Sequence, residues 1–114
     1  SASALQKYQI RASKAESNGG TSWTLVNSGA EAADQYSLCA EFNSGKPGDF
    51  NGVNFDLSNT DATASATVFA GNQTGESVGA GVERYLWFRI KTPTSVGNAK
   101  AKTIWVTVTA LVNG

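Results

Sequence analysis

The chain lacks most of the side chains that catalysis and metal binding usually need. It contains no histidine and, among its 114 residues, a single cysteine, Cys39. Without histidine there is no serine–histidine or cysteine–histidine pair to act as a nucleophile. A zinc site normally needs several cysteine or histidine ligands, and one cysteine cannot form a disulfide within its own chain. We therefore predict that the protein is not an enzyme and holds no cofactor, with calcium as the one candidate ion.

The charge and hydropathy of the chain exclude two classes of partner. Nine Lys and Arg residues balance nine Asp and Glu residues, so no net field favours nucleic acid or an anionic membrane. No stretch approaches the ~20 apolar residues of a membrane helix. Twelve glycines among many Ser, Thr, Asn and Ala residues suit a weakly charged, extracellular or cell-surface protein. We expect no nucleic acid partner and no membrane insertion.

The clearest pattern is strict alternation in two segments of the last third, 82–91 and 103–112. Successive side chains of a strand point to opposite faces, so this period of two predicts strands with one face in a core. The predicted core set, which includes two residues of a third alternating segment, 35–42, is Leu38, Phe42, Leu86, Phe88, Ile90, Ile104, Val106 and Val108. The opposite faces carry Tyr85, Trp87, Arg89, Lys91, Trp105, Thr107, Thr109 and Leu111.

Shorter strand patterns precede these two. They cover 8–12, 23–26, 35–42, 53–57 and 63–70, with turn signals at 18–20 and 27–29 and a glycine-rich connection at 71–81. Short strands between turns predict one domain, 1–114, folded as an all-β, immunoglobulin-like antiparallel β-sandwich of about six to eight strands. About six strands would be too few for a closed sandwich. The prediction therefore includes an edge that is completed by a strand from a neighbouring subunit.

Several segments carry a resemblance. They are Tyr36-Ser-Leu-Cys-Ala-Glu-Phe-Asn43, Phe69-Ala-Gly71, Arg84-Tyr-Leu-Trp-Phe-Arg-Ile-Lys-Thr-Pro-Thr94 and Thr103-Ile-Trp-Val-Thr-Val-Thr-Ala110. The chain resembles bacterial exported, surface-type β-sandwich domains, over roughly its C-terminal two-thirds. The resemblance implies structure and export rather than chemistry, and it offers no catalytic residues. In architecture the chain is also similar to subunits of extracellular fibres that complete one another with a donated strand.

An Asp- and Asn-rich stretch is the candidate metal site. Asp49, Asn51, Asp56 and Asp61 offer the oxygen ligands that calcium prefers. Their spacing does not match an EF-hand loop. Turn formation is the alternative, because Asp and Asn side chains bond to their own backbone.

Aromatic residues and strand edges are the candidate interface. If the two C-terminal strands pair, Trp87, Arg89, Trp105 and Thr107 share one patch, with Tyr85 on the same side as Trp87. Such residues dominate protein interfaces, but internal packing and stacking on a sugar are alternatives. The last strand is long and lacks the Lys or Pro that protects an exposed edge. Leu5 and Tyr8 belong to a first strand with almost nothing ahead of it.

These features predict a structural subunit of an extracellular filament, sheath or surface layer. Its partners would be copies of itself, joined through strand edges and the aromatic patch. One terminal strand would pair with the neighbouring copy. The alternative is a small carbohydrate-binding module that uses exposed Trp and Tyr residues on a polysaccharide. A third alternative is that the chain is an inhibitor or adaptor domain. For Cys39 we favour a small buried hydrophobe over a thiol that pairs between chains.

Overall fold

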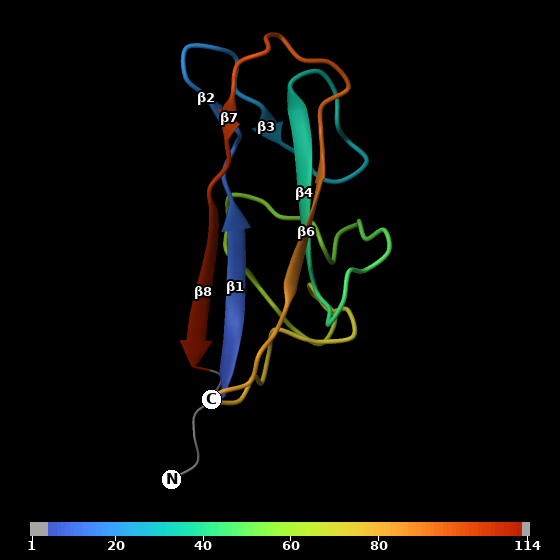
Figure 1. Ribbon diagram of the computed structural model, residues 1–114, viewed down its shortest axis with the longest axis vertical. Helices are drawn as coiled ribbons and strands as arrows, with labels where there is room; N and C mark the ends of the chain where they lie inside the picture. Colours follow the sequence, from blue (N-terminus) through green and yellow to red (C-terminus); the bar gives the residue numbers. More distant parts are fainter. Residues whose placement is uncertain (1–4, 113–114) are drawn as a thin grey trace.

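The computed structural model describes residues 5–112, which form eight β-strands and no helix (Figure 1). The strands are β1 (Gln6–Ala12), β2 (Glu16–Ser17), β3 (Thr24–Leu25), β4 (Gln35–Phe42), β5 (Ala62–Thr63), β6 (Leu86–Lys91), β7 (Lys102–Thr103) and β8 (Val106–Val112). They make two three-stranded sheets, β5-β1-β8 and β3-β4-β6, and a small β2-β7 pair. The all-β, sandwich-like fold predicted from alternation is confirmed.

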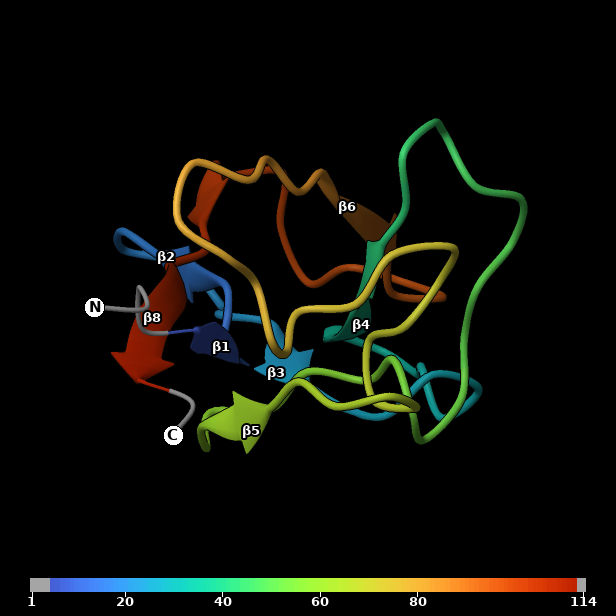
Figure 2. The ribbon, with the colours of Figure 1, turned by 90° about the horizontal axis from the view of Figure 1, so that it is seen from below.

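The two larger sheets form the layers of the sandwich. Figure 2, which looks along the strands, separates β1 and β8 from β4 and β6. β1 pairs antiparallel with β8, and Ile10 stands opposite Val108. β4 pairs antiparallel with β6, and Ala40 stands opposite Phe88. Residues directly opposite each other in an antiparallel pair share a face, so these registers identify the side of each strand that looks into the core.

The core lies between the sheets and is centred on β1 and β4. Its buried members are Ile10, Ala12, Ala15, Tyr36, Leu38, Ala40, Phe42, Leu57, Ala64 and Phe69. β4 matches its predicted range of 35–42 and is buried on both faces. Its outward side chains are covered by loops, since Ser37 donates to Glu31 and Cys39 donates to Asp56.

Several strand predictions were wrong in extent. No strand forms over 53–57, and β6 begins at Leu86 although its pattern was expected to begin at residue 82. Residues 63–70 were expected to be one strand, but β5 ends at Thr63. The hydroxyl of Ser65 accepts hydrogen bonds from the backbone N–H groups of Thr67 and Val68, which builds a turn in place of a ladder. The segment 103–112 is divided between β7 and β8, with Trp105 just before β8.

Candidate binding groove between the free edges of β6 and β8

Each large sheet ends in a strand that has one unpaired edge. Within residues 5–112, β6 pairs only with β4, and β8 pairs only with β1. β1 and β4 are different, because both of their edges are occupied. β1 lies between β8 and β5, and β4 lies between β6 and β3. A free edge presents backbone N–H and C=O groups that another strand can use.

The side chains on the inner faces of β6 and β8 are apolar but exposed. Phe88 and Ile90 stand opposite the buried Ala40 and Leu38. Both therefore face the core, yet 44 % of Phe88 and 49 % of Ile90 is exposed. On β8, Val108 stands opposite Ile10, which is completely buried, but 47 % of Val108 is exposed.

This exposure corrects the predicted core. Leu38 and Phe42 are buried, and Leu86 and Ile104 are partly buried against the core. Phe88, Ile90, Val106 and Val108 were also expected to be buried, and all four are exposed. The alternation itself was predicted correctly, since these side chains do lie on the inner faces. They stay exposed because β6 and β8 are the outermost strands of two different sheets and no described strand covers the space beside them.

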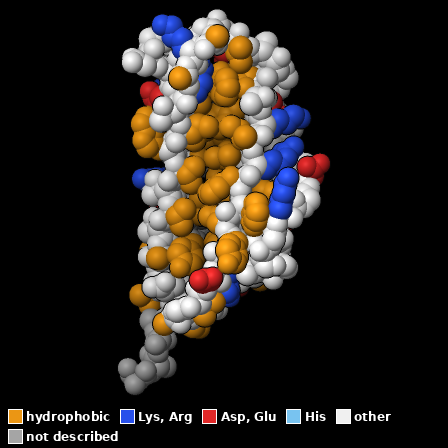
Figure 3. Space-filling model, viewed as in Figure 1, with side chains coloured by type: hydrophobic (Ala, Val, Ile, Leu, Met, Phe, Trp, Pro, Cys, Tyr) orange, Lys and Arg blue, Asp and Glu red, His pale blue; other side chains and the backbone are white. Residues whose placement is uncertain are grey.

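The result is an open apolar groove along the long axis of the molecule. Figure 3 shows hydrophobic side chains gathered in a hollow that runs between β8 on one side and β6 on the other. We use the name apolar groove for this hollow. Its walls are the inner faces of β6, with Leu86, Phe88 and Ile90, and of β8, with Val106, Val108, Ala110 and Val112.

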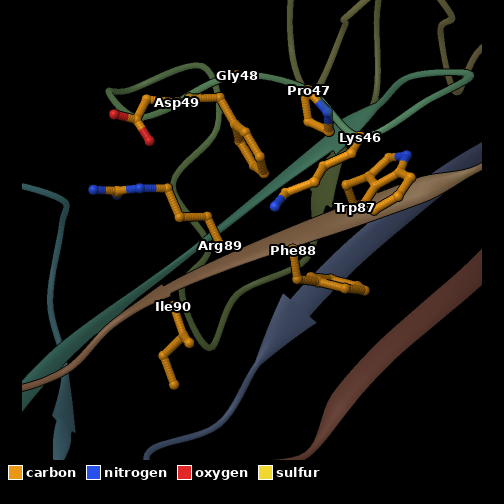
Figure 4. Close-up of a pocket in the computed structure, with 9 residues that line it drawn as sticks. Lys46, Pro47, Gly48, Asp49, Trp87, Phe88, Arg89 and Ile90 are labelled. Carbon is orange, nitrogen blue, oxygen red and sulfur yellow. The ribbon is translucent and has the colours of Figure 1, made fainter.

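A pocket of about 490 Å³ adjoins the free edge of β6. It is lined by Lys46, Pro47, Gly48, Asp49, Phe50, Trp87, Phe88, Arg89 and Ile90. Figure 4 shows Trp87 and Arg89 on the side of β6 that faces the 46–50 loop, and Phe88 and Ile90 on the side that faces β1. The ring orientation of Trp87 is fixed, because its Nε1 donates to the carbonyl oxygen of Asn43 at 2.9 Å. The Nη1 atom of Arg89 is enclosed and has no hydrogen-bond partner.

The predicted aromatic patch is not assembled within one subunit. β6 and β8 lie in different sheets, so the condition for a shared patch of Trp87, Arg89, Trp105 and Thr107 is not met. Thr107 stands opposite Arg11 on the β1–β8 sheet, and Trp105 is exposed there. An interface role for each of these residues, considered separately, stays a prediction.

The other predicted interface residues differ in their surroundings. Tyr85 and Leu5 are exposed. Tyr8 is half-buried, and its ring packs against Phe42 with 6.2 Å between centroids. Donation of either terminal strand to a neighbour is contradicted, because β8 pairs along its whole length with β1, and β1 also pairs with β5 of its own chain. Its residues Ile10 and Ala12 are fully buried, which makes β1 a central strand.

The candidate calcium ligands do not converge. Asp56 accepts hydrogen bonds from the backbone N–H of Ser28 at 3.0 Å and from the thiol of Cys39 at 3.3 Å. Asp61 forms an exposed ion pair with Arg11, Asp49 lines the pocket, and Asn51 is exposed. In the part of the chain that the structure describes, no three His, Cys, Asp or Glu side chains are grouped to hold a metal. Calcium binding gains no support from the geometry and stays a prediction.

Two carboxylates beneath the loops were not singled out from the sequence. Glu31 accepts from the Ser37 hydroxyl at 2.5 Å, and this bond lowers its pKa. The backbone N–H of Gly29 and the ammonium of Lys91, 3.7 Å away, act in the same direction. Glu41 is buried on the outward face of β4, and burial raises its pKa. An isolated Glu in a loop or an alternating strand gives no sequence signal for such an environment.

No family model matches this chain, and no curated protein or solved structure is significantly similar to it. Among residues 5–112 there is no helix with the length and hydrophobicity needed to cross a membrane.

Proposed function

We propose that this protein is a structural, non-enzymatic subunit of an extracellular filament, sheath or surface layer. Its open sandwich is completed by a strand from a neighbouring copy, which occupies the apolar groove. The observation that carries the proposal is the coincidence of two free strand edges with inward-facing, exposed apolar side chains on both.

The chemistry of the groove favours a strand as its occupant. An added strand would satisfy the backbone N–H and C=O groups along the free edge of β6 or β8. Its inward side chains would cover Phe88, Ile90, Val106 and Val108 and complete the core. Burying apolar surface contributes about 25 cal/mol per Å². Large contiguous apolar patches are rare on monomers and mark sites of association.

Strand addition between identical copies would build a polymer. The groove of one copy and the strand of the next are different surfaces, so the contact is heterologous. Heterologous contacts extend into filaments unless the rotation between copies closes a ring. The free edge of β8 is suited to strand addition. Its residues, Val-Thr-Val-Thr-Ala-Leu-Val, include neither a charge nor a proline that would protect the edge.

Substitution in the groove tests the proposal. A Val108→Lys variant places a charge on the wall of the groove, and burial of an unpaired charge beneath an added strand is strongly unfavourable. We expect electron microscopy and sedimentation to show polymers of the original protein and monomers of this variant. The matched control is Val53→Lys, because Val53 is 89 % exposed and lies outside the groove. Polymers that persist in Val108→Lys, or an original protein that is monomeric at all concentrations, would contradict the proposal.

The pocket beside β6 favours a second candidate, a small carbohydrate-binding module. Trp87 presents a ring of fixed orientation, and Lys46, Asp49 and Arg89 offer polar groups around it. Particle size separates the two candidates, since a module of this kind would function as a monomer.

A further inference from the structure

Asparagine is followed by glycine at three places in the chain, 18–19, 51–52 and 113–114, and the third lies outside the described residues. In such a pair the backbone nitrogen of the glycine can attack the side-chain carbonyl carbon of the asparagine, because glycine has no Cβ to obstruct the approach. A five-membered succinimide ring forms, and the side-chain nitrogen leaves as ammonia. Water then opens the ring to aspartate or isoaspartate. The net change is the loss of a neutral amide and the gain of a carboxylate.

The Asn18–Gly19 pair is exposed and is not restrained by hydrogen bonds. It forms the turn that follows β2, and Gly19 has a φ of +77°. Within residues 5–112, neither the Asn18 side chain nor the Gly19 N–H has a hydrogen-bond partner. The attacking nitrogen and the carbonyl carbon can therefore approach each other without breaking such a bond.

A cation lies beside this pair. The Nζ atom of Lys100 would be 3.6 Å from a Cβ placed on Gly19, so it lies close to the backbone of that glycine. During the reaction the attacking nitrogen loses its proton, and the addition step places negative charge on the side-chain oxygen of Asn18. A neighbouring ammonium stabilises negative charge at both positions.

The Asn51–Gly52 pair has the same chemistry but a restrained nucleophile. The Gly52 N–H donates to the hydroxyl oxygen of Ser28 at 2.8 Å. The carbonyl oxygen of Gly52 accepts from the N–H groups of Phe55 and Asp56, at 2.9 and 3.0 Å. The peptide groups on both sides of Gly52 are therefore anchored, and its nitrogen can attack only after it leaves Ser28.

We propose that Asn18 is a site of spontaneous deamidation in the native protein and that the fold protects Asn51 from the same reaction. The product at Asn18 is a mixture of aspartate and isoaspartate beside Lys100. Because the formal net charge of the chain is zero, each reacted copy becomes an anion. Neither statement depends on the apolar groove or on its occupant.

Timed incubation of the intact protein at mildly alkaline pH tests both statements. Cleavage after glutamate releases residues 17–31, with Asn18, and residues 42–76, with Asn51. Tandem mass spectrometry then measures how much of each asparagine has become aspartate or isoaspartate. We expect Asn18 to react about 10-fold faster than Asn51, the factor that one hydrogen bond contributes to an equilibrium. In the urea-unfolded chain the two rates should be nearly equal.

Three variants locate the effect. Ser28→Ala removes the acceptor of the Gly52 N–H and should speed the reaction of Asn51 without changing that of Asn18. Lys100→Gln removes the neighbouring ammonium and should slow the reaction of Asn18. Lys7→Gln is the matched control, because Lys7 lies on β1, and it should leave both rates unchanged.

Each measurement has a result that would overturn the proposal. Equal rates at the two sites of the native protein, or a faster reaction at Asn51, would refute it. An unchanged rate at Asn51 in folded Ser28→Ala would show that the Gly52 hydrogen bond is not the protection. Circular dichroism melts establish that this variant is folded, and if it is not, the native and urea-unfolded rates of Asn51 decide: equal rates would show that the fold gives no protection.

Discussion

Phe88 and Ala40 stand opposite each other in the β4–β6 register and face the same side, yet Ala40 is fully buried and 44 % of Phe88 is exposed. β4 has partners along both edges, whereas β6 is the last strand of its sheet. The core is therefore complete at β4 and incomplete one strand further out. The other sheet shows the same difference in burial, because Ile10 is completely buried whereas Val108, which stands opposite it, is exposed.

This difference predicts unequal costs for two similar substitutions. Phe42→Ala removes a side chain that is 3 % exposed and should lower the free energy of unfolding by about 3–5 kcal/mol. Phe88→Ala should cost the monomer only about 1–2 kcal/mol, because nearly half of that side chain already contacts water. Urea unfolding of the monomer measures both. Equal costs would mean that Phe88 is packed in a closed core.

Glu31 should stabilise the fold in a pH-dependent way. Its pKa is lowered, first by the hydrogen bond from Ser37, so the folded state holds the ionised form better than the unfolded state. The stabilisation is present above the ordinary pKa of 4.5 and is lost as the pH falls through the folded pKa. We expect Glu31→Gln to lower the melting temperature at pH 7, with the difference narrowing in acid. A difference that does not vary with pH would contradict this role.

Glu41 should have the opposite effect. Burial raises its pKa, so ionised Glu41 opposes folding at neutral pH and the penalty is relieved as the pH falls through the folded pKa. Glu41→Gln should therefore raise the melting temperature at pH 7, and the gain should disappear in acid. Thermal melts of the two Gln variants over pH 3–8 give slopes of opposite sign if both assignments are right.

Cys39 should be unreactive in the native protein. It is fully buried, and burial together with the Asp56 carboxylate raises the pKa of its thiol to about 11. Only the thiolate is nucleophilic, and at pH 8 this pKa leaves about 0.1 % of the thiol ionised. Iodoacetamide should therefore modify the native protein at least about 100-fold more slowly than the urea-unfolded chain. Rapid labelling of the native protein would show that Cys39 is accessible.

The sequence was sufficient for the longer strands and the faces of their side chains, but not for the burial of those side chains. Alternation in 82–91 and 103–112 correctly placed Phe88 and Val108 on inner faces. Burial depends on what lies beside a strand in space, and a period of two contains no information about that neighbour. The pattern also did not show that β6 and β8 belong to different sheets, so the shared aromatic patch was wrong.

The pocket could not be predicted for a similar reason. Lys46 and Phe50 lie in a loop with no periodic pattern, and only the folded chain brings them beside Trp87 and Arg89. The calcium hypothesis came from composition within a single stretch. The fold instead gives Asp56 and Asp61 separate partners on different parts of the molecule.

The central claim is that a strand from a neighbouring copy occupies the apolar groove. Cryo-electron microscopy of the assembled protein tests this most directly, at a resolution that traces the backbone. We expect an additional strand along the free edge of β6, contributed by a neighbouring copy, with Phe88, Ile90 and Val108 covered by its side chains. An assembly in which the groove faces solvent, or in which subunits meet only through other surfaces, would contradict it.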